Sequence, residues 1–379
     1  MINTDYRSLF EAEEYKFLLE TREFMRSEIA PYAKQIDEED AVPQVVFDLL
    51  KPYLALTIPK AYGGLGHGEM YDCISVQELG AVCPALVTYL EIAQLFGHAL
   101  RIGGSEAQRK KYLPQIVDGV VGAYALTDHT PGSDPANMYT TATANGDGWD
   151  LVGRKRFITF ANIAEMMVVF ARDTSVDKPA LSAFVVEAPY DGLTFIRRNE
   201  WNGLRGHEAW EFELDMHTSN IVGAPGQGLN IALEVLNYTR TSLACGHIGL
   251  ADTALDLAIQ FAKEREVGGK AIFKNQSISF ALIEAKARVE GARLLAYRAA
   301  RLCEKGIEHR GETAMAKFSA AEALIDAVTV SNRILGGYSA NLDYDSERHL
   351  RDAFTWVAAH GTIEIQKMTA ARKLFSSRK

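Results

Sequence analysis

The sequence has few cysteines and shows none of the arrangements that make cysteine functional. Its 379 residues include four, Cys73, Cys83, Cys245 and Cys303, with no Cys-x-x-Cys pair and no cysteine–histidine spacing suited to a metal. We therefore expect no metal site and no disulfide framework. The thiols are predicted to be small buried apolar groups of a protein that folds in a reducing compartment.

The sequence also has no surplus of positive charge and no long run of apolar residues. The chain has 40 lysines and arginines against 49 aspartates and glutamates, a formal net charge of −9. Proteins that bind nucleic acids need a basic surplus to neutralise phosphates, so we expect no nucleic-acid partner, although a local basic spot can still hold one phosphorylated ligand. The absence of about 18 consecutive apolar residues and of an apolar signal core near the N-terminus predicts no membrane partner and a cytoplasmic protein.

The pattern of apolar residues indicates helices at both ends of the chain. Positions at helical spacing recur in Glu11–Lys34, Tyr71–Val82 and Ala85–Ile102. The C-terminal part returns to longer helical runs, of which Ile272–Cys303 contains no proline. Several long helices of this kind are typical of a bundle.

The middle of the chain has a different character. Short alternating segments at 138–143, 149–152, 166–170 and 183–187 are separated by glycine, aspartate and proline, which predicts β-strands. We therefore predict an α+β fold in three domains. They are an N-terminal α-helical domain at 1–119, a middle antiparallel β-domain at 120–227 that forms a small barrel, and a C-terminal four-helix bundle at 228–379.

Two segments of the middle domain carry groups that suit a flavin. Residues 124–134 read Tyr-Ala-Leu-Thr-Asp-His-Thr-Pro-Gly-Ser-Asp, a strand end followed by a turn. Free backbone N–H groups and hydroxyls in such a turn match the polar ring edge and the pyrophosphate of a flavin dinucleotide. Residues 153–159, Gly-Arg-Lys-Arg-Phe-Ile-Thr, add an aromatic surface and a further hydroxyl.

These segments, with Arg-Ile-Leu-Gly-Gly at 333–337 and Gly-Thr-Ile-Glu-Ile-Gln at 361–366, resemble the motifs of the flavin-dependent acyl-CoA dehydrogenases in their order. The resemblance covers nearly the whole chain. It implies an acyl-CoA-dehydrogenase-like subunit with bound FAD, assembled as a homotetramer or homodimer in which FAD is shared across an interface.

The resemblance also implies roles for single residues at the cofactor. Phe157 would stack on the flavin, Thr159 would hydrogen-bond flavin N5, and Arg265 would reach the pyrophosphate of a neighbouring subunit with its planar charged fork. The full implied cofactor set is Leu126, Thr127, Gly132, Ser133, Phe157, Thr159, Arg265, Gln276, Gly336, Gly337, Thr362 and Glu364.

The implied substrate channel contains Ser133, Asn237, Thr239, Arg240, Gly361 and Arg372. Several positions depart from the family pattern, among them Phe157, where a tryptophan is usual, and Ser339, where a glycine is usual. His129 and Thr130 alter the rim of the flavin segment, and Gly268 stands where a phenylalanine is usual, which removes a packing contact to the cofactor.

The proton acceptor of the family is missing from its usual place. The residue before Gly361-Thr362 is His360 rather than glutamate, and the alternative position before Arg240 is Thr239. His360, with an ordinary pKa near 6.5, is one candidate base; its other interpretation is that it fills space or binds a substrate oxygen. Glu91, which interrupts the apolar run Val87–Ile92, is the second candidate. Burial would raise its pKa as a base requires, although a solvated structural glutamate is the alternative.

The sequence therefore predicts FAD-dependent desaturation of an acyl thioester, on coenzyme A or an acyl carrier protein. The proton would be removed by a base in a non-standard place, at a carbon remote from the α-carbon if Glu91 is that base. Electron-transfer flavoprotein or oxygen would accept the electrons. Two alternatives remain at this point: a flavin-dependent monooxygenase or oxidase on the same scaffold, and a non-catalytic subunit that pairs with an active paralogue.

Overall fold

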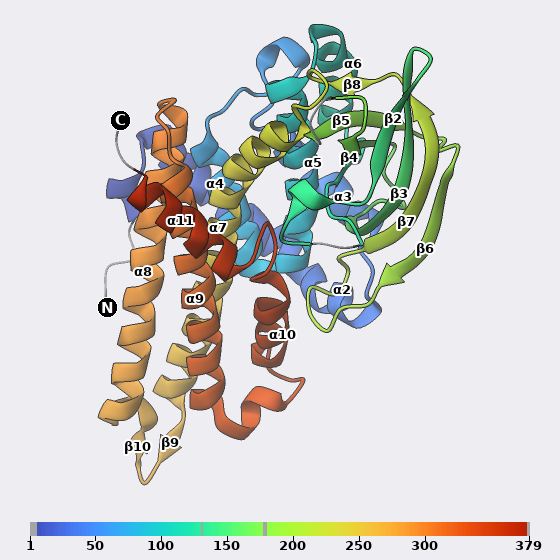
Figure 1. The fold of residues 1–379 in the computed structure, drawn as a ribbon. Coiled ribbons are helices and arrows are strands. Elements are labelled where there is room, and N and C mark those ends of the chain that lie inside the picture. The colour runs from blue at the N-terminus through green and yellow to red at the C-terminus, as the bar shows by residue number, and fades with distance from the viewer. Residues whose placement is uncertain (1–5, 130–131, 177–179, 377–379) are drawn as a thin grey trace.

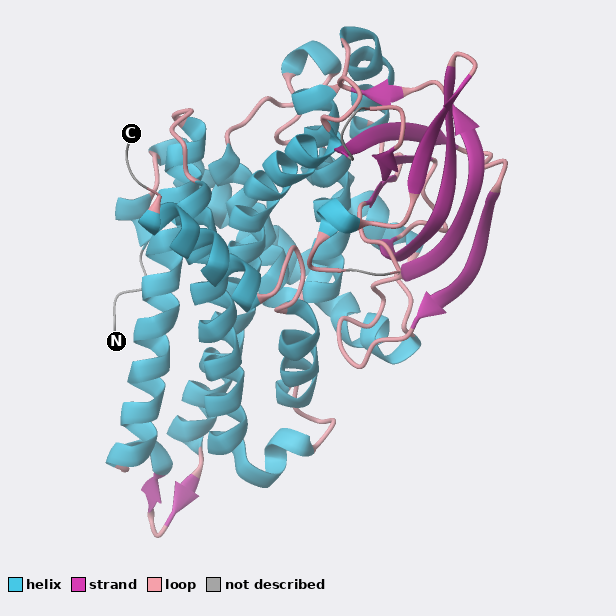
Figure 2. Cartoon of the chain, viewed as in Figure 1, coloured by secondary structure: helices cyan, strands magenta, loops and turns pink. Residues whose placement is uncertain are grey.

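The computed structural model describes residues 6–129, 132–176 and 180–376. A curved sheet occupies one side of the molecule, and helices from both ends of the chain fill the other (Figure 1). In Figure 2 the strands of the large sheet gather on one side and the helices on the other, apart from a small strand pair at the far end of the helices, so the α–β–α order of the sequence becomes two structural parts in space. The α+β fold class is confirmed.

The described N-terminal part of the chain forms six α-helices. They are α1 (Ala12–Phe24), α2 (Ala33–Glu39), α3 (Gln44–Leu54), α4 (Glu69–Val82), α5 (Pro84–Gly103) and α6 (Glu106–Val117). Of these, α1, α3 and α6 pack against α4 or α5. Every residue from Pro84 to Leu100 of α5 is buried, as expected for a helix that is apolar on all faces. Because Glu91 lies in the middle of this stretch, it sits in the protein core and not on a solvated face.

The predicted helix over Glu11–Lys34 is wrong in one respect. After α1 the chain makes a π-helical turn at Met25–Ile29 and a 3-10 turn at Ala30–Tyr32 before α2 begins. Pro31 explains the change, because its ring lacks the N–H that would continue the α-helical hydrogen bonds.

The sheet is mostly antiparallel, with the strand order β6-β7-β3-β2-β4-β5-β8. The strands are β1 (Gly122–Ala125), β2 (Thr141–Asn145), β3 (Gly148–Thr159), β4 (Met166–Asp173), β5 (Ala180–Glu187), β6 (Leu193–Asn199), β7 (Ala209–Thr218) and β8 (Ile221–Val222). Two pairs are parallel, β1 with β4 and β2 with β4. The expectation of an antiparallel domain therefore holds for the hairpin-linked strands and is wrong for these two.

The strand predicted at 138–143 begins only at Thr141. The backbone N–H groups of Tyr139 and Thr140 donate to the Asp128 carboxylate at 2.6 and 2.8 Å instead of joining a neighbouring strand. Asp128 also accepts from the Lys155 ammonium at 2.6 Å, and both side chains are almost completely buried. This ion pair anchors the flavin-type segment 124–129 to strand β3.

The C-terminal part is a bundle of long helices: α7 (Gly228–Glu264), α8 (Gln276–Glu304), α9 (Arg310–Leu335), α10 (Ser346–Trp356) and α11 (Ile363–Phe375). A small hairpin of β9 (Glu266–Val267) and β10 (Lys270–Ala271) joins α7 to α8 at the far end of the bundle (Figure 1). Helix α7 packs against α4, α5, α8 and α9 and so connects the two ends of the sequence.

Among the helices of the described ranges, none is both long and apolar enough to cross a membrane. The cytoplasmic location stays a prediction.

The Asp128–Lys155 pair gives a test of the fold. Asp128→Asn leaves a buried ammonium without its counter-charge, so we expect the free energy of unfolding to fall by about 3–5 kcal/mol. Glu322→Gln, which breaks the exposed Glu322–Lys367 pair, is the control and should cost about 1 kcal/mol or less. Thermal and urea unfolding measure both. Equal losses in the two variants would show that the buried pair does not anchor the segment.

Candidate active site

The two candidate bases, Glu91 and His360, lie next to each other. Glu91 projects from α5 and is 4% exposed. His360 lies in the turn between α10 and α11, and its Nε2 is 3.8 Å from Glu91 Oε2. This separation exceeds a direct hydrogen bond, but a small side-chain rotation would close it. The structure thus brings together two residues that the sequence offered as alternatives.

The turn that carries His360 is held from three helices. Arg240 on α7 donates from Nε to the His360 carbonyl at 2.8 Å, and Gln366 on α11 donates to the same oxygen at 3.1 Å. Lys317 on α9 donates from Nζ to the carbonyls of Val357 and Gly361 at 2.6 and 3.1 Å. His360 adopts a positive φ of 54°, which is unfavourable for a side-chain-bearing residue and persists only where the surroundings impose it.

Burial shifts the pKa values of the two candidate bases in opposite directions. Desolvation raises the pKa of Glu91 well above its ordinary value, Asp72 on α4 raises it further, and Lys317 opposes both. Desolvation lowers the pKa of His360 to about 3, and the charges of Arg240 and Lys317 act in the same direction. At neutral pH His360 is therefore an uncharged, weakly basic ring, whereas Glu91 has the affinity for a proton that a base requires.

Glu91 also has an oxygen available. Its Oε1 is buried and has no hydrogen-bond partner among the described residues. A buried carboxylate oxygen left in this state costs free energy unless a ligand or water completes it. Glu91 thus faces His360 Nε2 with one oxygen, at 3.8 Å, and has no partner among the described residues on the other.

The predicted channel residues divide into two groups. Thr239 and Arg240 belong to the His360 site, with Thr239 Oγ1 3.2 Å from His360 Nδ1. Asn237 instead meets His309, its Nδ2 lying 3.2 Å from His309 Nε2, while its buried Oδ1 has no partner in the described ranges.

On the sheet side, Phe157 and Thr159 lie at the end of β3. The pairing of β3 with β7 shifts between Lys155 and Ile158, and Phe157 has a φ of 59° within this irregularity. Such a bulge redirects side chains, and Phe157 is 42% exposed. Its ring contacts Trp201 at 5.3 Å between centroids.

A cavity of about 590 Å³ opens at this aromatic surface, lined by Arg156, Phe157, Arg197, Arg198, Asn199, Glu200 and Trp201. Three buried donor atoms, Arg156 Nε, Arg198 Nε and Trp201 Nε1, lack a hydrogen-bond partner in the part of the chain that the structure describes. An exposed ring beside cationic groups and free donors fits a planar anionic cofactor such as FAD. FAD bound there would supply the hydride acceptor.

Sequence reasoning missed Trp201 and also His207, whose Nε2 is 3.1 Å from Thr159 Oγ1. Both lie in the irregular segment between β6 and β7, where no periodic pattern marks a side chain as functional. Only their aromatic character was visible in the sequence.

The first predicted flavin segment is only partly described. Leu126 and Thr127 are half-buried just beyond β1, whereas Gly132 and Ser133 are exposed. Thr130 lies outside the described residues. His129 is accounted for by a contact within the sheet: its Nδ1 is 3.0 Å from Glu211 Oε1.

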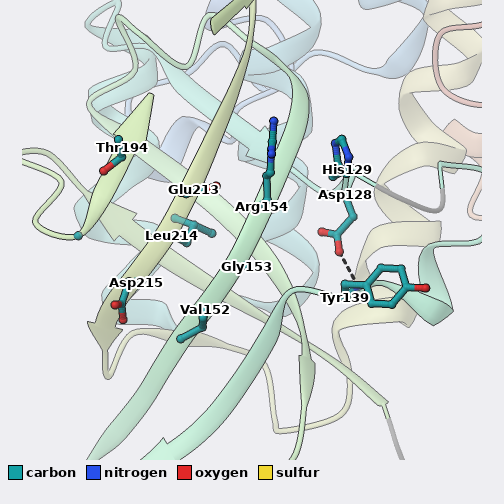
Figure 3. A pocket seen from close by; sticks show the side chains of 11 residues that line it. Asp128, His129, Tyr139, Val152, Gly153, Arg154, Thr194, Glu213, Leu214 and Asp215 are labelled. Atoms are coloured by element: carbon teal, nitrogen blue, oxygen red, sulfur yellow. Dashed lines mark hydrogen bonds between the residues drawn. The ribbon is translucent and has the colours of Figure 1, made fainter. Parts of the chain in front are cut away.

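A second cavity, of about 640 Å³, lies on the face of the sheet that His129 borders (Figure 3). Its basic wall is His129 and Arg154, both in contact with Glu211, which Arg197 also neutralises at 2.9 Å. Glu213 and Asp215 from β7 line the same cavity, and Glu213 is the strand partner of Arg154. Because the lining carries charges of both signs, this cavity shows no preference for an anion.

The remaining predicted cofactor residues do not reach His360 in this chain. Arg265 ends α7 in an exposed position, with its guanidinium carbon 5.4 Å from the Tyr338 ring centre. Gln276, Gly336 and Gly337 are exposed at the same end of the bundle. At the start of α11, Thr362 accepts from the Ile365 N–H at 3.4 Å, while Glu364 and Arg372 are exposed along that helix.

Known proteins resemble the chain along its whole length. Models of the acyl-CoA dehydrogenase N-terminal, middle and C-terminal domains match residues 11–120, 123–216 and 226–375. An acyl-CoA dehydrogenase of Bacillus subtilis (strain 168) is 34% identical over 365 residues, which cover 93% of this chain and 95% of that protein.

Solved structures of related proteins share the fold of this chain. Butyryl-CoA dehydrogenase from Megasphaera elsdenii superposes with a TM-score of 0.92 at 29% identity, covering 96% of this chain and 98% of that one. The prolyl acyl carrier protein oxidase AnaB superposes with a TM-score of 0.90 at 26% identity, covering 97% of this chain and all, 100%, of that one. With its three domains matched in order and its fold shared, the chain belongs to the acyl-CoA dehydrogenase family.

Proposed function

We propose that this flavoenzyme desaturates an acyl thioester with Glu91 as the proton acceptor. Membership of the family makes the chain an FAD-dependent oxidoreductase that acts on CH–CH groups. The observation that carries the finer proposal is the buried Glu91 carboxyl, whose Oε1 is unpartnered and whose pKa is raised. Such a group is set to take a proton from carbon as the hydride leaves for the cofactor.

The position of Glu91 favours a carbon remote from the thioester. His360 occupies the place beside Gly361 where the sequence pattern expects the α-carbon base, and its low pKa makes it a poor acceptor. Glu91 comes from α5 and faces the Nε2 edge of the His360 ring, away from the Nδ1 edge at Thr239. We infer that it removes a γ- or δ-proton, and that the resulting unsaturation lies further along the acyl chain.

His360 then acts as a positioning residue. Thr239 fixes its Nδ1 side, and Nε2 faces the Glu91 carboxyl. A neutral ring in this place limits the rotation of Glu91 without adding a charge. Once Glu91 has gained its proton, the ring nitrogen also offers an acceptor for it.

The proposal includes a thioester on coenzyme A or on an acyl carrier protein, since the relative AnaB is named for a carrier-bound substrate. Electron-transfer flavoprotein or oxygen would reoxidise the cofactor, and oxygen would make the chain an oxidase. We also propose a homotetramer or homodimer, because Arg265, which the family resemblance assigns to the FAD of a neighbouring subunit, is exposed at the end of α7. The interface would lie at the β9–β10 end of the bundle.

Separate substitutions of Glu91 and His360 test which of the two residues accepts the proton. Glu91→Gln is nearly isosteric but cannot accept a proton, so turnover should fall by about 10²–10⁴-fold. His360→Gln, which keeps a polar group in the turn, should cost much less. Anaerobic flavin bleaching with a panel of saturated, branched and unsaturated acyl thioesters measures both. A silent Glu91→Gln beside an inactive His360→Gln would make His360 the acceptor instead.

Restoring the family's carboxylate gives a second test. Saturated straight-chain substrates such as butyryl-CoA should reduce the wild-type flavin poorly, and His360→Glu should raise that rate by about 10²-fold or more. Rapid bleaching of the wild-type enzyme by butyryl-CoA would contradict the absence of an α-carbon base. Thr239→Val is the matched control, because it alters the same site without adding a carboxylate.

The pH dependence of flavin reduction gives a third test of Glu91 as the base. Only ionised Glu91 accepts a proton, so the rate of flavin reduction should rise with pH through the raised pKa of Glu91. His360, with a pKa of about 3, should add no step near 6.5. The step should vanish in Glu91→Gln and persist in His360→Gln. If it persists in Glu91→Gln, it belongs to Asp72 or Lys317, whose pKa values are shifted to about 6 and about 7.

A further inference from the structure

The backbone at the end of β3 brings a histidine to Thr159. Thr159 pairs with Ala209 at the start of β7, and the neighbouring Phe160 N–H donates to the Glu208 carbonyl at 2.7 Å. His207, one residue before Glu208, therefore lies beside the strand end, with Nε2 3.1 Å from Thr159 Oγ1.

His207 is held as a neutral ring. Burial lowers its pKa to about 4, Arg198 on β6 lowers it further, and Asp40 at the end of α2 acts in the opposite direction. The ring lies nearly parallel to that of Trp201, 6.1 Å away with an interplanar angle of 18°, and the Phe160 ring is 6.3 Å away. A neutral imidazole has one N–H and one lone pair, so it can act on Thr159 in two ways.

The surroundings select one tautomer. His207 Nδ1 is buried and has no hydrogen-bond partner in the described ranges. A hydrogen on Nδ1 would be an orphaned buried donor, whereas a hydrogen on Nε2 has Thr159 Oγ1 as its acceptor. His207 therefore donates from Nε2 to Thr159.

That donation decides what the Thr159 hydroxyl can do. One of its lone pairs is engaged by His207, and among the described residues no acceptor lies within hydrogen-bond reach of its own hydrogen. The hydrogen is free to point outward, toward whatever binds beside Phe157. A threonine without this neighbour would rotate between donating and accepting.

We infer that His207 is a positioning residue that holds the Thr159 hydroxyl as a hydrogen-bond donor to flavin N5. Oxidised flavin offers a lone pair at N5, whereas reduced flavin carries a hydrogen there, so a fixed donor favours the oxidised form. This inference rests on the proposed contact between Thr159 and the flavin. It does not depend on Glu91 as the base, so failure of the Glu91 assignment leaves it standing.

The test uses flavin spectra and redox equilibria of the FAD-loaded protein rather than turnover. His207→Phe keeps the ring volume against Trp201 and removes both nitrogens. It should shift the visible flavin absorption and move the oxidised–reduced equilibrium, measured against a reference dye, toward reduced flavin by about two- to tenfold, the change expected for one net hydrogen bond. In a Thr159→Val background the same substitution should change nothing further.

Two variants control for packing. His349→Phe replaces a histidine of α10 that is also buried and also neutral, with a pKa lowered to about 4, and should leave the flavin equilibrium unchanged. His207→Gln retains an N–H donor and should stay within about twofold of the wild type. If His207→Phe does not fold, His207→Met serves as the second removal of the donor.

The inference is overturned by an unchanged equilibrium in His207→Phe or His207→Met, or by an equal shift in the Thr159→Val background. A shift in Thr159→Val alone, with His207 variants silent, would keep the threonine at the flavin and exclude the histidine. If Thr159→Val leaves both the spectrum and the equilibrium unchanged, the contact between Thr159 and the flavin is absent, and the inference fails with it.

Discussion

The constraint on which the site depends is the removal of ionisable groups from water between α5, α7 and α9. Glu91, Lys317, Arg240 and His360 all lie in this space, and desolvation is the largest influence on the pKa of each. It disfavours every charged form, so the carboxyl becomes more basic while the ring, the ammonium and the guanidinium become more acidic. One physical effect thus makes Glu91 the stronger base and His360 the weaker one without a specific contact for each.

The same burial sets the geometry. Lys317 is fully buried and satisfies its ammonium with the carbonyls of Val357 and Gly361. A buried cation needs such acceptors, and the carbonyls available are those of the turn that carries His360. The cost of burying Lys317 and the unfavourable φ of His360 are therefore coupled, because the turn must adopt this shape to receive the ammonium. Loss of the cation would release the turn as well as alter the charge near Glu91.

The sequence predicted those features that depend on local pattern. The apolar run of α5 predicted a helix, and Glu91, which interrupts that run, stood out as the residue whose pKa burial would raise. The parallel pairing of β1 and β2 with β4 could not be predicted from the sequence, because it depends on long connections between strands and not on the alternation of apolar and polar residues. Met138–Thr140 failed as a strand for a related reason: the partner of its backbone is the side chain of Asp128, ten or more residues earlier. His207 and Trp201 were missed because residues in irregular segments acquire a role only from the strands that happen to lie beside them.

The proximity of Glu91 and His360 also lay outside sequence reasoning, since it needs α5 and the α10–α11 turn to meet across α7. Their meeting changes how the departure from the family pattern is understood. A histidine in place of the usual base would, alone, suggest either a replacement base or a lost activity. Beside a buried carboxyl with one unpartnered oxygen, the histidine fits the proposal that Glu91 on α5 is the base and that His360 positions it. In the proposed mechanism the proton would move to the α5 side of the ring, and FAD, held beside Phe157 and Thr159, would accept the hydride on the sheet side. A substrate that bridges these two groups must extend past His360 into the helices, and this extension is why the reacting carbon is expected to lie further from the thioester.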